Sequence, residues 1–346
     1  MTAAARRSRV PDRTRQLVDE LHERALRSAL TSLPAREPRR HLYDLLPEYP
    51  KRPGKGLRPV LCMAACAAYG GDYRDALPFA AALELLHNAF LVHDDIQDGS
   101  DVRRGGPALH VAHGTPLALN AGDALAARAN AVFLRAARGQ RRHVAAALLE
   151  GWERMIDQTI EGQARDLGWQ RDNTVDVSTA DYLGMCGQKT AWYTTIQPLA
   201  IGALVGSGDA GRERETFRFA WLLGLLFQIA NDLDGIRPDA GKSEIEEGKR
   251  TILVIHLLGA LSGPDRDEAV RIMRLPRDQR RGPEVEWVRG KMETEGSVEH
   301  ARDCVSELAV AARREADAVF LELPRSEARD LLRQSTDYVL EQHGLP

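Results

Sequence analysis

Two apolar runs with helical spacing, each ending in acidic or amide side chains, constrain the fold of this chain more than any other feature. The first run, Ala80 to Val92, leads into Asp94-Asp95-Ile96-Gln97-Asp98. The second, Trp221 to Ile229, leads into Asn231-Asp232-Leu233-Asp234. Surface helices are rarely apolar up to their polar end, so both runs are expected to be buried. Because sites in helical bundles are commonly built from facing helices, the two polar ends are predicted to face each other across a bundle interior.

Signals for β-strands are nearly absent, because the longest runs of β-branched residues are short and lie within Ala/Leu-rich segments. The 346 residues, 43% of them hydrophobic, are enough for a large core. Between Pro53 and Ala260 no Ser/Gly/Pro-rich linker is long enough to separate two cores. We therefore predict an all-α fold with one large helical domain over residues 13–346, preceded by a disordered basic tail over residues 1–12.

Charge and hydropathy exclude several classes of protein. A formal net charge of −3 leaves no general basic surface, so nucleic acid is not an expected partner despite Arg6-Arg7-Ser8-Arg9. No apolar stretch is expected to reach the roughly 18 to 20 residues of a membrane span, and the N-terminus lacks a signal peptide. The four cysteines form no C-x-x-C pair and are interpreted as packed small side chains. We expect a soluble, cytoplasmic protein in a reducing compartment.

Three carboxylates and two arginines lie together at the end of the first apolar run. The spacing of Asp94, Asp95 and Asp98 places them at one end of one helix face, and Arg103-Arg104 follows five residues later. Carboxylate oxygens suit Mg²⁺, which often completes its shell with substrate phosphates, and arginine binds phosphate with two parallel hydrogen bonds. The combination predicts a diphosphate held between metal ions and arginines. Taken alone, the same pattern is also compatible with a solvated helix end that carries a surface charge cluster.

Lysine is rare, since only six of the 47 basic residues are lysines. Four of them lie in glycine-flanked or polar segments between helical runs: Lys55, Lys189, Lys242 and Lys249. An ammonium group on a flexible stem is a good partner for phosphate at a helix end. Each could be an ordinary loop lysine, but together with the acidic cluster they predict phosphate ligands. In the second polar segment, Gln228, Asn231 and Asp232 share one helix face and offer oxygen ligands to a metal.

The ordered set of motifs resembles the trans-isoprenyl diphosphate synthases, the polyprenyl synthetase family that makes farnesyl, geranylgeranyl and longer prenyl diphosphates. Gly54-Lys55-Gly56-Leu57-Arg58-Pro59 is similar to the GKxxRP motif of the family, and the first acidic segment with the arginine pair is similar to its first aspartate-rich region. Further matches follow in order: Glu84-Leu85-Leu86-His87, Asn120-Ala121-Gly122-Asp123, Gln163, Lys189-Thr190, Phe227-Gln228, Gly241-Lys242 and Glu247-Gly248-Lys249-Arg250-Thr251. The matches cover well over half of the chain.

The resemblance implies an all-helical bundle with a deep central cavity, usually a homodimer, that condenses isopentenyl diphosphate head-to-tail with an allylic diphosphate. It implies about three Mg²⁺ ions per active site, with the ligands Asp94, Asp98, Asn231 and Asp232, and with Asp95 in support. The implied ligands of the allylic diphosphate are Arg103, Lys189 and Lys242, and Lys249 is a further expected substrate-binding residue. Those of isopentenyl diphosphate are Lys55, Arg58, His87 and Arg104. Thr190 and Gln228 would line the reacting carbon.

Asn231 departs from the second aspartate motif of the family, which usually reads DDxxD. An amide oxygen can coordinate Mg²⁺ but carries no charge, so metal affinity there is expected to fall. Residues 231–239 also loosely resemble the NDxxSxxxE motif of class I terpene cyclases, although Gly235 has no hydroxyl and Pro238 is expected to end the helix. The alternatives to chain elongation are therefore a cyclase or unusual prenyltransferase, and a non-catalytic subunit of a heteromeric synthase. The complete isopentenyl diphosphate set argues against the first, and the intact first motif against the second.

Ala89 and Phe90 occupy the fifth and fourth positions before Asp94, where side chains in the family form the floor under the growing product. A small residue at position 89 deepens the cavity, whereas an aromatic ring at position 90 either blocks it or packs in the core. The expected product is C20, with C15 as the alternative.

Overall fold

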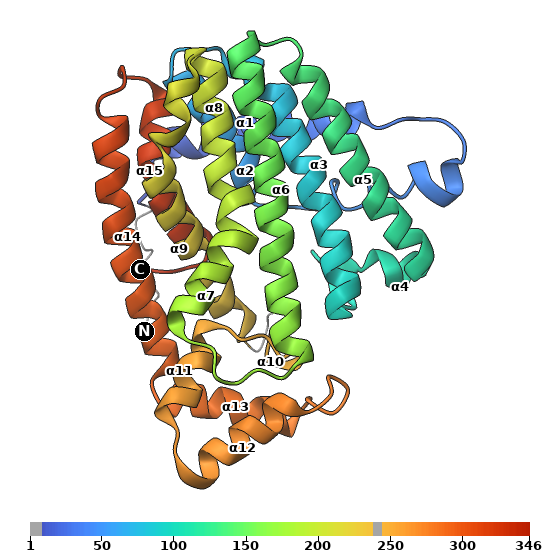
Figure 1. The fold of residues 1–346 in the computed structure, drawn as a ribbon, viewed down its shortest axis with the longest axis vertical. Coiled ribbons are helices and arrows are strands. Elements are labelled where there is room, and N and C mark those ends of the chain that lie inside the picture. Colours follow the sequence, from blue (N-terminus) through green and yellow to red (C-terminus); the bar gives the residue numbers. More distant parts are fainter. Residues whose placement is uncertain (1–8, 238–243) are drawn as a thin grey trace. The chain divides into compact units, whose positions relative to one another are not determined.

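Helices form almost all of the regular structure in the computed structural model, which describes residues 9–237 and 244–346. The α-helices are α1 (Asp12–Ser32), α2 (Leu57–Ala68), α3 (Tyr73–Asp98), α4 (Leu109–His113), α5 (Thr115–Ala137), α6 (Arg142–Arg171), α7 (Thr179–Cys186), α8 (Gln197–Ser207), α9 (Phe217–Gly235), α10 (Glu244–Glu247), α11 (Ile252–Ala260), α12 (Gly263–Arg274), α13 (Pro283–Thr294), α14 (Ser297–Phe320) and α15 (Glu327–Gln342) (Figure 1). Short π and 3-10 helices are η1 (Arg39–Tyr43), η2 (Gly187–Ile196) and η3 (Ala210–Arg214). The predicted all-α fold is confirmed.

One small antiparallel hairpin interrupts the helices. Its strands, β1 (Val102–Arg103) and β2 (Gly106–Pro107), pair Val102 with Pro107 and Arg103 with Gly106. The turn residues, Arg104 and Gly105, both have positive φ angles of 49° and 76°. Two positive φ angles in a two-residue hairpin loop are typical of a type I′ turn. We call residues 102–107 the arginine hairpin.

The described chain divides into two compact units. The first contains the chain up to Trp152 together with Thr195–Phe219 and Arg313–Pro346, and the second contains Glu153–Thr194 and Ala220–Ala312. The single domain expected from the sequence stays a prediction, as does the expectation that the two polar helix ends face one interior. The expected boundary of the tail at residue 13 is late, because Val10 is buried and its N–H donates to Glu341 Oε1 at 3.0 Å. Residues 1–8 of the tail lie outside the described residues.

α3 is the core helix of the first unit, where it packs against α1, α2, α5 and α8. Asp72 caps its start by accepting a hydrogen bond from the Arg74 N–H at 2.8 Å, and Gly99, with φ at 61°, ends it. By length and composition this 26-residue helix could cross a membrane, which contradicts the sequence-based expectation that no stretch is long enough. However, 72% of its most apolar window is buried inside the protein, so α3 is a core helix.

The second unit contains α7 and α10 to α13, and within it α11 packs against α7, α12 and α13. The Thr251 side chain caps α11 by accepting a hydrogen bond from the Val254 N–H at 3.4 Å. The polar side chains of the second unit that the sequence predicted for the site come from α6, η2, α9 and the turn after α10. All four cysteines of the chain are free thiols and three are buried, in agreement with their interpretation as packed side chains.

Candidate active site

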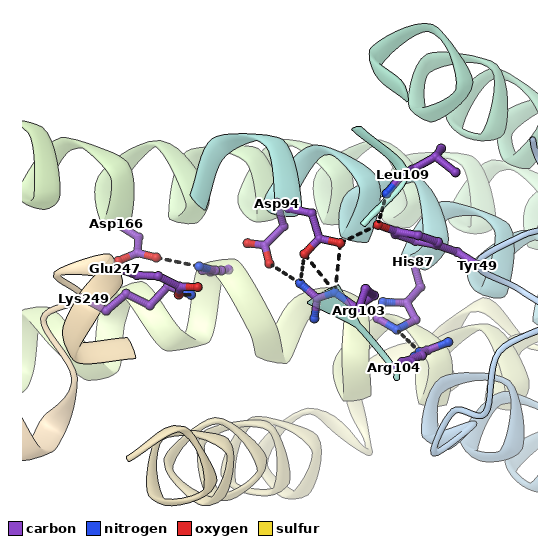
Figure 2. Close-up of polar contacts among 11 residues, drawn as sticks. Tyr49, His87, Asp94, Arg103, Arg104, Leu109, Asp166, Glu247 and Lys249 are labelled. Atoms are coloured by element: carbon purple, nitrogen blue, oxygen red, sulfur yellow. Dashed lines mark hydrogen bonds and ion pairs between the residues drawn. The ribbon is translucent and has the colours of Figure 1, made fainter. Parts of the chain in front are cut away.

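The buried carboxylate of Asp95 is the centre of the polar cluster at the end of α3. Arg103 donates from Nε to both oxygens of Asp95, at 2.9 and 3.0 Å, and also from Nη2 to Oδ1. The Tyr49 hydroxyl donates to Asp95 Oδ2 at 2.6 Å (Figure 2). Burial would lower the pKa of Arg103, but the hydrogen bonds and charge of Asp95 outweigh it and raise the pKa. Asp95 therefore holds Arg103 in place and is a supporting residue in this geometry.

Asp94 and Asp98 lie one helical turn apart on α3 and frame Asp95. Asp94 is half-buried, with Oδ2 at 3.3 Å from Arg103 Nη2, whereas Asp98 is buried. Within residues 9–237 and 244–346, no cluster of three or more His, Cys, Asp or Glu side chains is arranged to hold a metal ion. A pair of carboxylates fits Mg²⁺ nonetheless, because this ion usually binds one or two protein carboxylates and takes its other ligands from water and phosphate. We call Asp94, Asp95, Asp98 and Arg103 the first acidic site.

The arginine hairpin brings Arg104 against His87 of α3 and the glycine-rich loop before α2. Arg104 Nη2 lies 3.3 Å from His87 Nε2, and because a guanidinium can only donate, the imidazole accepts. Burial lowers the pKa of His87 well below its ordinary value, and the charges of Arg58 and Arg104 lower it further, so the ring is neutral. A side chain at Gly54 would begin only 3.1 Å from the Arg104 guanidinium. The structure therefore brings together three residues predicted from separate motifs, Arg58, His87 and Arg104.

The cations around this loop repel one another. Burial lowers the pKa of Arg104, the charge of the buried Glu84 opposes this, and the nearby charges of Arg103, Arg58 and Arg52 lower the pKa further. Lys55 lies in the same loop, where its Nζ is 2.9 Å from Nε2 of the buried His343 after α15. Cations that are held close together despite their mutual repulsion are typical of an anion-binding site.

A second buried carboxylate, Asp232 of α9, is held by neutral donors. The Tyr182 hydroxyl donates to its Oδ2 at 2.6 Å, and Gln228 Nε2 donates to its Oδ1 at 2.8 Å. Thr190 donates in turn to Gln228 Oε1 at 2.6 Å, so the predicted pair of Thr190 and Gln228 is in direct contact. Burial raises the pKa of Asp232 to about 6, although the hydrogen bonds from Tyr182 and Gln228 oppose this. We call Thr190, Gln228, Asn231 and Asp232 the second acidic site; Asn231 itself is half-buried.

Two lysines of the second unit are paired with buried carboxylates to which the sequence analysis gave no role. Lys189 Nζ donates to Asp166 Oδ2 at 2.5 Å, and Lys249 Nζ lies 2.8 Å from Glu247 Oε2 (Figure 2). Burial would raise the pKa of Asp166, but the charges of Lys189 and Lys249 and the hydrogen bond from Lys189 outweigh it and lower the pKa. Lys189 lies in the π-helical η2, a geometry that is frequent at functional sites.

The sequence analysis missed Tyr49, Tyr182 and Asp166, and it named Glu247 within a motif without giving it a role. Asp166 lies three residues after Gln163, so helical spacing from that residue could have found it. Neither tyrosine has a local signal, because each contacts an aspartate about fifty residues away, at separations of 46 and 50. Lys242 lies outside the described residues. Ala89 is buried and Phe90 is half-buried, and their role in product length stays a prediction.

The comparisons with known proteins all match this chain to synthases of prenyl diphosphates. A family model described as Polyprenyl synthetase matches residues 39–288. A short chain isoprenyl diphosphate synthase of Methanothermobacter thermautotrophicus is 33% identical over 297 residues, which cover 83% of this chain and 86% of the relative. A geranylfarnesyl diphosphate synthase of Natronomonas pharaonis is 30% identical over 352 residues, covering 95% and 98%. A geranylgeranyl pyrophosphate synthetase structure from Pyrococcus horikoshii matches with a TM-score of 0.82 at 26% identity, covering 95% of this chain and 98% of that one.

Proposed function

Because the chain belongs to the polyprenyl synthetase family and is a prenyltransferase that makes prenyl diphosphates, we propose that it joins isopentenyl diphosphate head-to-tail (1′-4) to an allylic prenyl diphosphate. The first acidic site supports this most strongly. Arg103 binds its central carboxylate, Asp95, through both oxygens and also lies 3.3 Å from Asp94 Oδ2, so a guanidinium stands beside the two carboxylates, Asp94 and Asp98, that we assign to the metal ion. The guanidinium is fixed beside them and does not need to reorganise when the substrate binds.

In this proposal, Asp94 and Asp98 hold Mg²⁺ at the first acidic site, and Asp232 and Asn231 offer weaker ligands at the second. When bound, the metal ions would neutralise charge that develops on the departing diphosphate. Arg103 and, in the second unit, Lys189 and Lys249 supply fixed positive charge to the allylic diphosphate; Lys242, which lies outside the described residues, is assigned to it from the resemblance alone. Fixed donors of this kind stabilise the transition state because they are already oriented.

We assign isopentenyl diphosphate to a cluster beside the arginine hairpin. This cation cluster consists of the cations Lys55, Arg58 and Arg104 and the neutral ring of His87. The neutral His87 ring helps to orient Arg104 without adding charge. Thr190 and Gln228 would lie at the reacting carbon, where alignment and exclusion of water favour attack by the double bond on the allylic cation. The departing pyrophosphate then takes up the proton, so no dedicated protein base is needed.

We propose C20 as the main product, with C15 as the alternative. The small, buried Ala89 favours a deep cavity, and the relatives include C20 and C25 synthases. A homodimer in the cytoplasm is the expected form of the enzyme.

Product analysis tests the proposal. The purified chain is incubated with labelled isopentenyl diphosphate and a C5, C10 or C15 primer, with Mg²⁺ or with EDTA, and the products are identified by mass spectrometry. We expect labelled C20 diphosphate with Mg²⁺ and none with EDTA. Absence of any longer diphosphate with every primer would contradict chain elongation.

A class I cyclase is the second candidate, because Asn231-Asp232 starts a loosely similar motif. A cyclase does not need a site for isopentenyl diphosphate, so it would have no use for the cluster of Lys55, Arg58, His87 and Arg104. The contact of Arg104 with His87 in the structure favours the elongating enzyme, for which the cluster has a substrate.

A further inference from the structure

The arginine hairpin is too small to hold its own shape. Each strand has two residues, and isolated two-stranded hairpins are at best marginally stable in water. Arg104 adopts a left-handed backbone conformation that is unfavourable for residues with a side chain. The orientation of Arg103 and Arg104 must therefore be imposed by contacts from outside the hairpin.

One set of outside contacts comes from Tyr49, which is buried in the turn-rich segment before α2. Its hydroxyl donates to Asp95 Oδ2 at 2.6 Å and accepts from the Leu109 N–H at 2.9 Å. The Tyr49 hydroxyl oxygen thus connects the end of α3, which precedes the hairpin in the chain, with the start of α4, which follows it (Figure 2). Burial and the nearby Asp95 raise the pKa of Tyr49, so the hydroxyl keeps the proton that it donates.

A second set comes from Arg52, three residues after Tyr49. Its Nη1 donates to the carbonyl oxygen of Arg103 at 2.9 Å, and its guanidinium lies over the Tyr49 ring, 4.7 Å from the ring centroid. On the opposite strand, a side chain at Gly106 would begin 3.2 Å from the Arg52 guanidinium. Arg52 therefore binds the backbone of one strand at Arg103 and occupies the space beside Gly106, its pairing partner on the other strand.

We propose that Tyr49 and Arg52 are positioning residues that set the two hairpin arginines for diphosphate binding. Tyr49 acts through Asp95, whose carboxylate orients the Arg103 side chain, and Arg52 acts on the Arg103 backbone. The inference rests on the proposed function, because it assigns diphosphate to Arg103 and Arg104. A merely structural tyrosine would contribute to stability without altering anion affinity.

The test measures affinity for inorganic pyrophosphate by calorimetry in the presence of Mg²⁺, together with kcat and KM for the allylic primer. Tyr49→Phe removes only the hydroxyl and is expected to weaken pyrophosphate binding and raise KM about tenfold, with a smaller change in kcat. The matched control is Tyr69→Phe, which removes a buried hydroxyl that donates to Glu215 at 3.2 Å. The control is expected to bind pyrophosphate like the wild type. Equal affinities of Tyr49→Phe and the wild type would overturn the proposal.

A double-mutant cycle separates positioning from general stability. In an Arg103→Gln background, Tyr49→Phe is expected to weaken binding less than about twofold further, because its effect passes through Arg103. Fully additive losses would overturn the assignment. If Tyr49→Phe does not fold, Arg52→Met takes its place, with Arg52→Lys expected to restore most of the affinity because it keeps a donor for the Arg103 carbonyl. Failure of lysine to restore any affinity would count against the role of Arg52.

The outcomes also separate this inference from the proposed function. Pyrophosphate binding that depends on Tyr49 in a protein that makes no longer diphosphate would support the inference and reject elongation. Normal elongation by the wild type, with no effect of Tyr49→Phe on affinity or KM, would support elongation and reject the inference.

Discussion

The two acidic sites share a local geometry but differ in charge. Asp95 and Asp232 are both buried, and each accepts a 2.6 Å hydrogen bond from a tyrosine hydroxyl, Tyr49 or Tyr182. The other donor is the Arg103 guanidinium in the first site and the Gln228 amide in the second. At the second site burial outweighs the hydrogen bonds from Tyr182 and Gln228 and the nearby charge of Lys249, and it raises the pKa of Asp232 to about 6. The same tyrosine contact is therefore present in both sites, whereas a cation donates directly to the carboxylate in the first site and a neutral amide does so in the second.

The largest expected effect is on stability, after removal of the cation of the first site. Arg103→Gln leaves Asp95 buried without a counter-charge and should lower the free energy of unfolding by about 3 kcal/mol or more. Gln228→Met removes a neutral donor from Asp232 and should cost about 1 kcal/mol. Urea unfolding at pH 7 measures both, with Arg24→Gln as a control that loses an exposed ion pair with Glu20. Equal losses of unfolding free energy in Arg103→Gln and Gln228→Met would contradict the difference in charge between the two sites.

The next effect is on turnover and tests which carboxylates of the first site serve the reaction. Asp94→Ala or Asp98→Ala should lower kcat several tens-fold or more, a loss of about 2 kcal/mol or above in transition-state stabilisation. Asp101→Ala, an exposed carboxylate in the segment after α3, is the control and should keep its activity. Near-normal turnover of both variants with Mg²⁺ present would remove the metal assignment.

A change in product length tests the assignment of α3 to the substrate cavity. Ala89→Phe should shorten the longest product by at least one C5 unit, because the ring fills space that the tail needs. Phe90→Ala should lengthen the product if the ring lies in the cavity. Mass spectrometry of both variants with the same primer measures the shift. Unchanged products in both would place the two side chains in the core instead.

The pH dependence of stability sharpens the comparison at the second site. Because the pKa of Asp232 is raised from near 4 to about 6, the folded protein binds more protons than the unfolded chain between these values. The cost of ionising Asp232 is therefore present in full above pH 6 and disappears as the pH falls towards 4. Asp232→Asn should be stabilised relative to the wild type at pH 7 in EDTA, and this advantage should vanish at pH 4. An advantage that does not change with pH would contradict the raised pKa.

The smallest expected effect comes from adding a charge at the second site. Asn231→Asp supplies an anionic metal ligand and should lower the Mg²⁺ concentration for half-maximal rate severalfold, with diphosphates still the products. Asn173→Asp, in the loop after α6, tests whether any added negative charge has this effect and should leave the Mg²⁺ requirement unchanged. An unchanged requirement in Asn231→Asp would show that this position does not bind the metal.

Local patterns in the sequence were sufficient for the fold class and for contacts within one helix or between neighbouring segments. Helical spacing predicted that Asp94, Asp95 and Asp98 share one end of α3, and the short distance to the arginine pair suggested their contact. Spacing alone did not show that Asp95 holds Arg103 while Asp94 and Asp98 are assigned to the metal. It depends on Tyr49, which reaches Asp95 from 46 residues away through tertiary packing.

The second acidic site shows the same limit. Spacing placed Gln228 and Asp232 together, and the structure adds a hydrogen bond between them. It did not indicate Tyr182, nor the pairing of Lys189 with the buried Asp166, because each partner comes from another helix. The pKa of Asp232 depends on burial as well as on hydrogen-bond partners, and burial follows from packing rather than from the motif.

The reaction of wild-type enzyme with geranylgeranyl diphosphate tests the central claim most directly. The substrate is supplied alone, in parallel with reactions that contain labelled isopentenyl diphosphate and a C5 primer, all with Mg²⁺. Extracts and headspace are then analysed by mass spectrometry. The account predicts that geranylgeranyl diphosphate alone is inert and that the C5 units give a labelled C20 or C15 diphosphate. A cyclic hydrocarbon or alcohol from geranylgeranyl diphosphate alone, with no labelled diphosphate from C5 units, would contradict it.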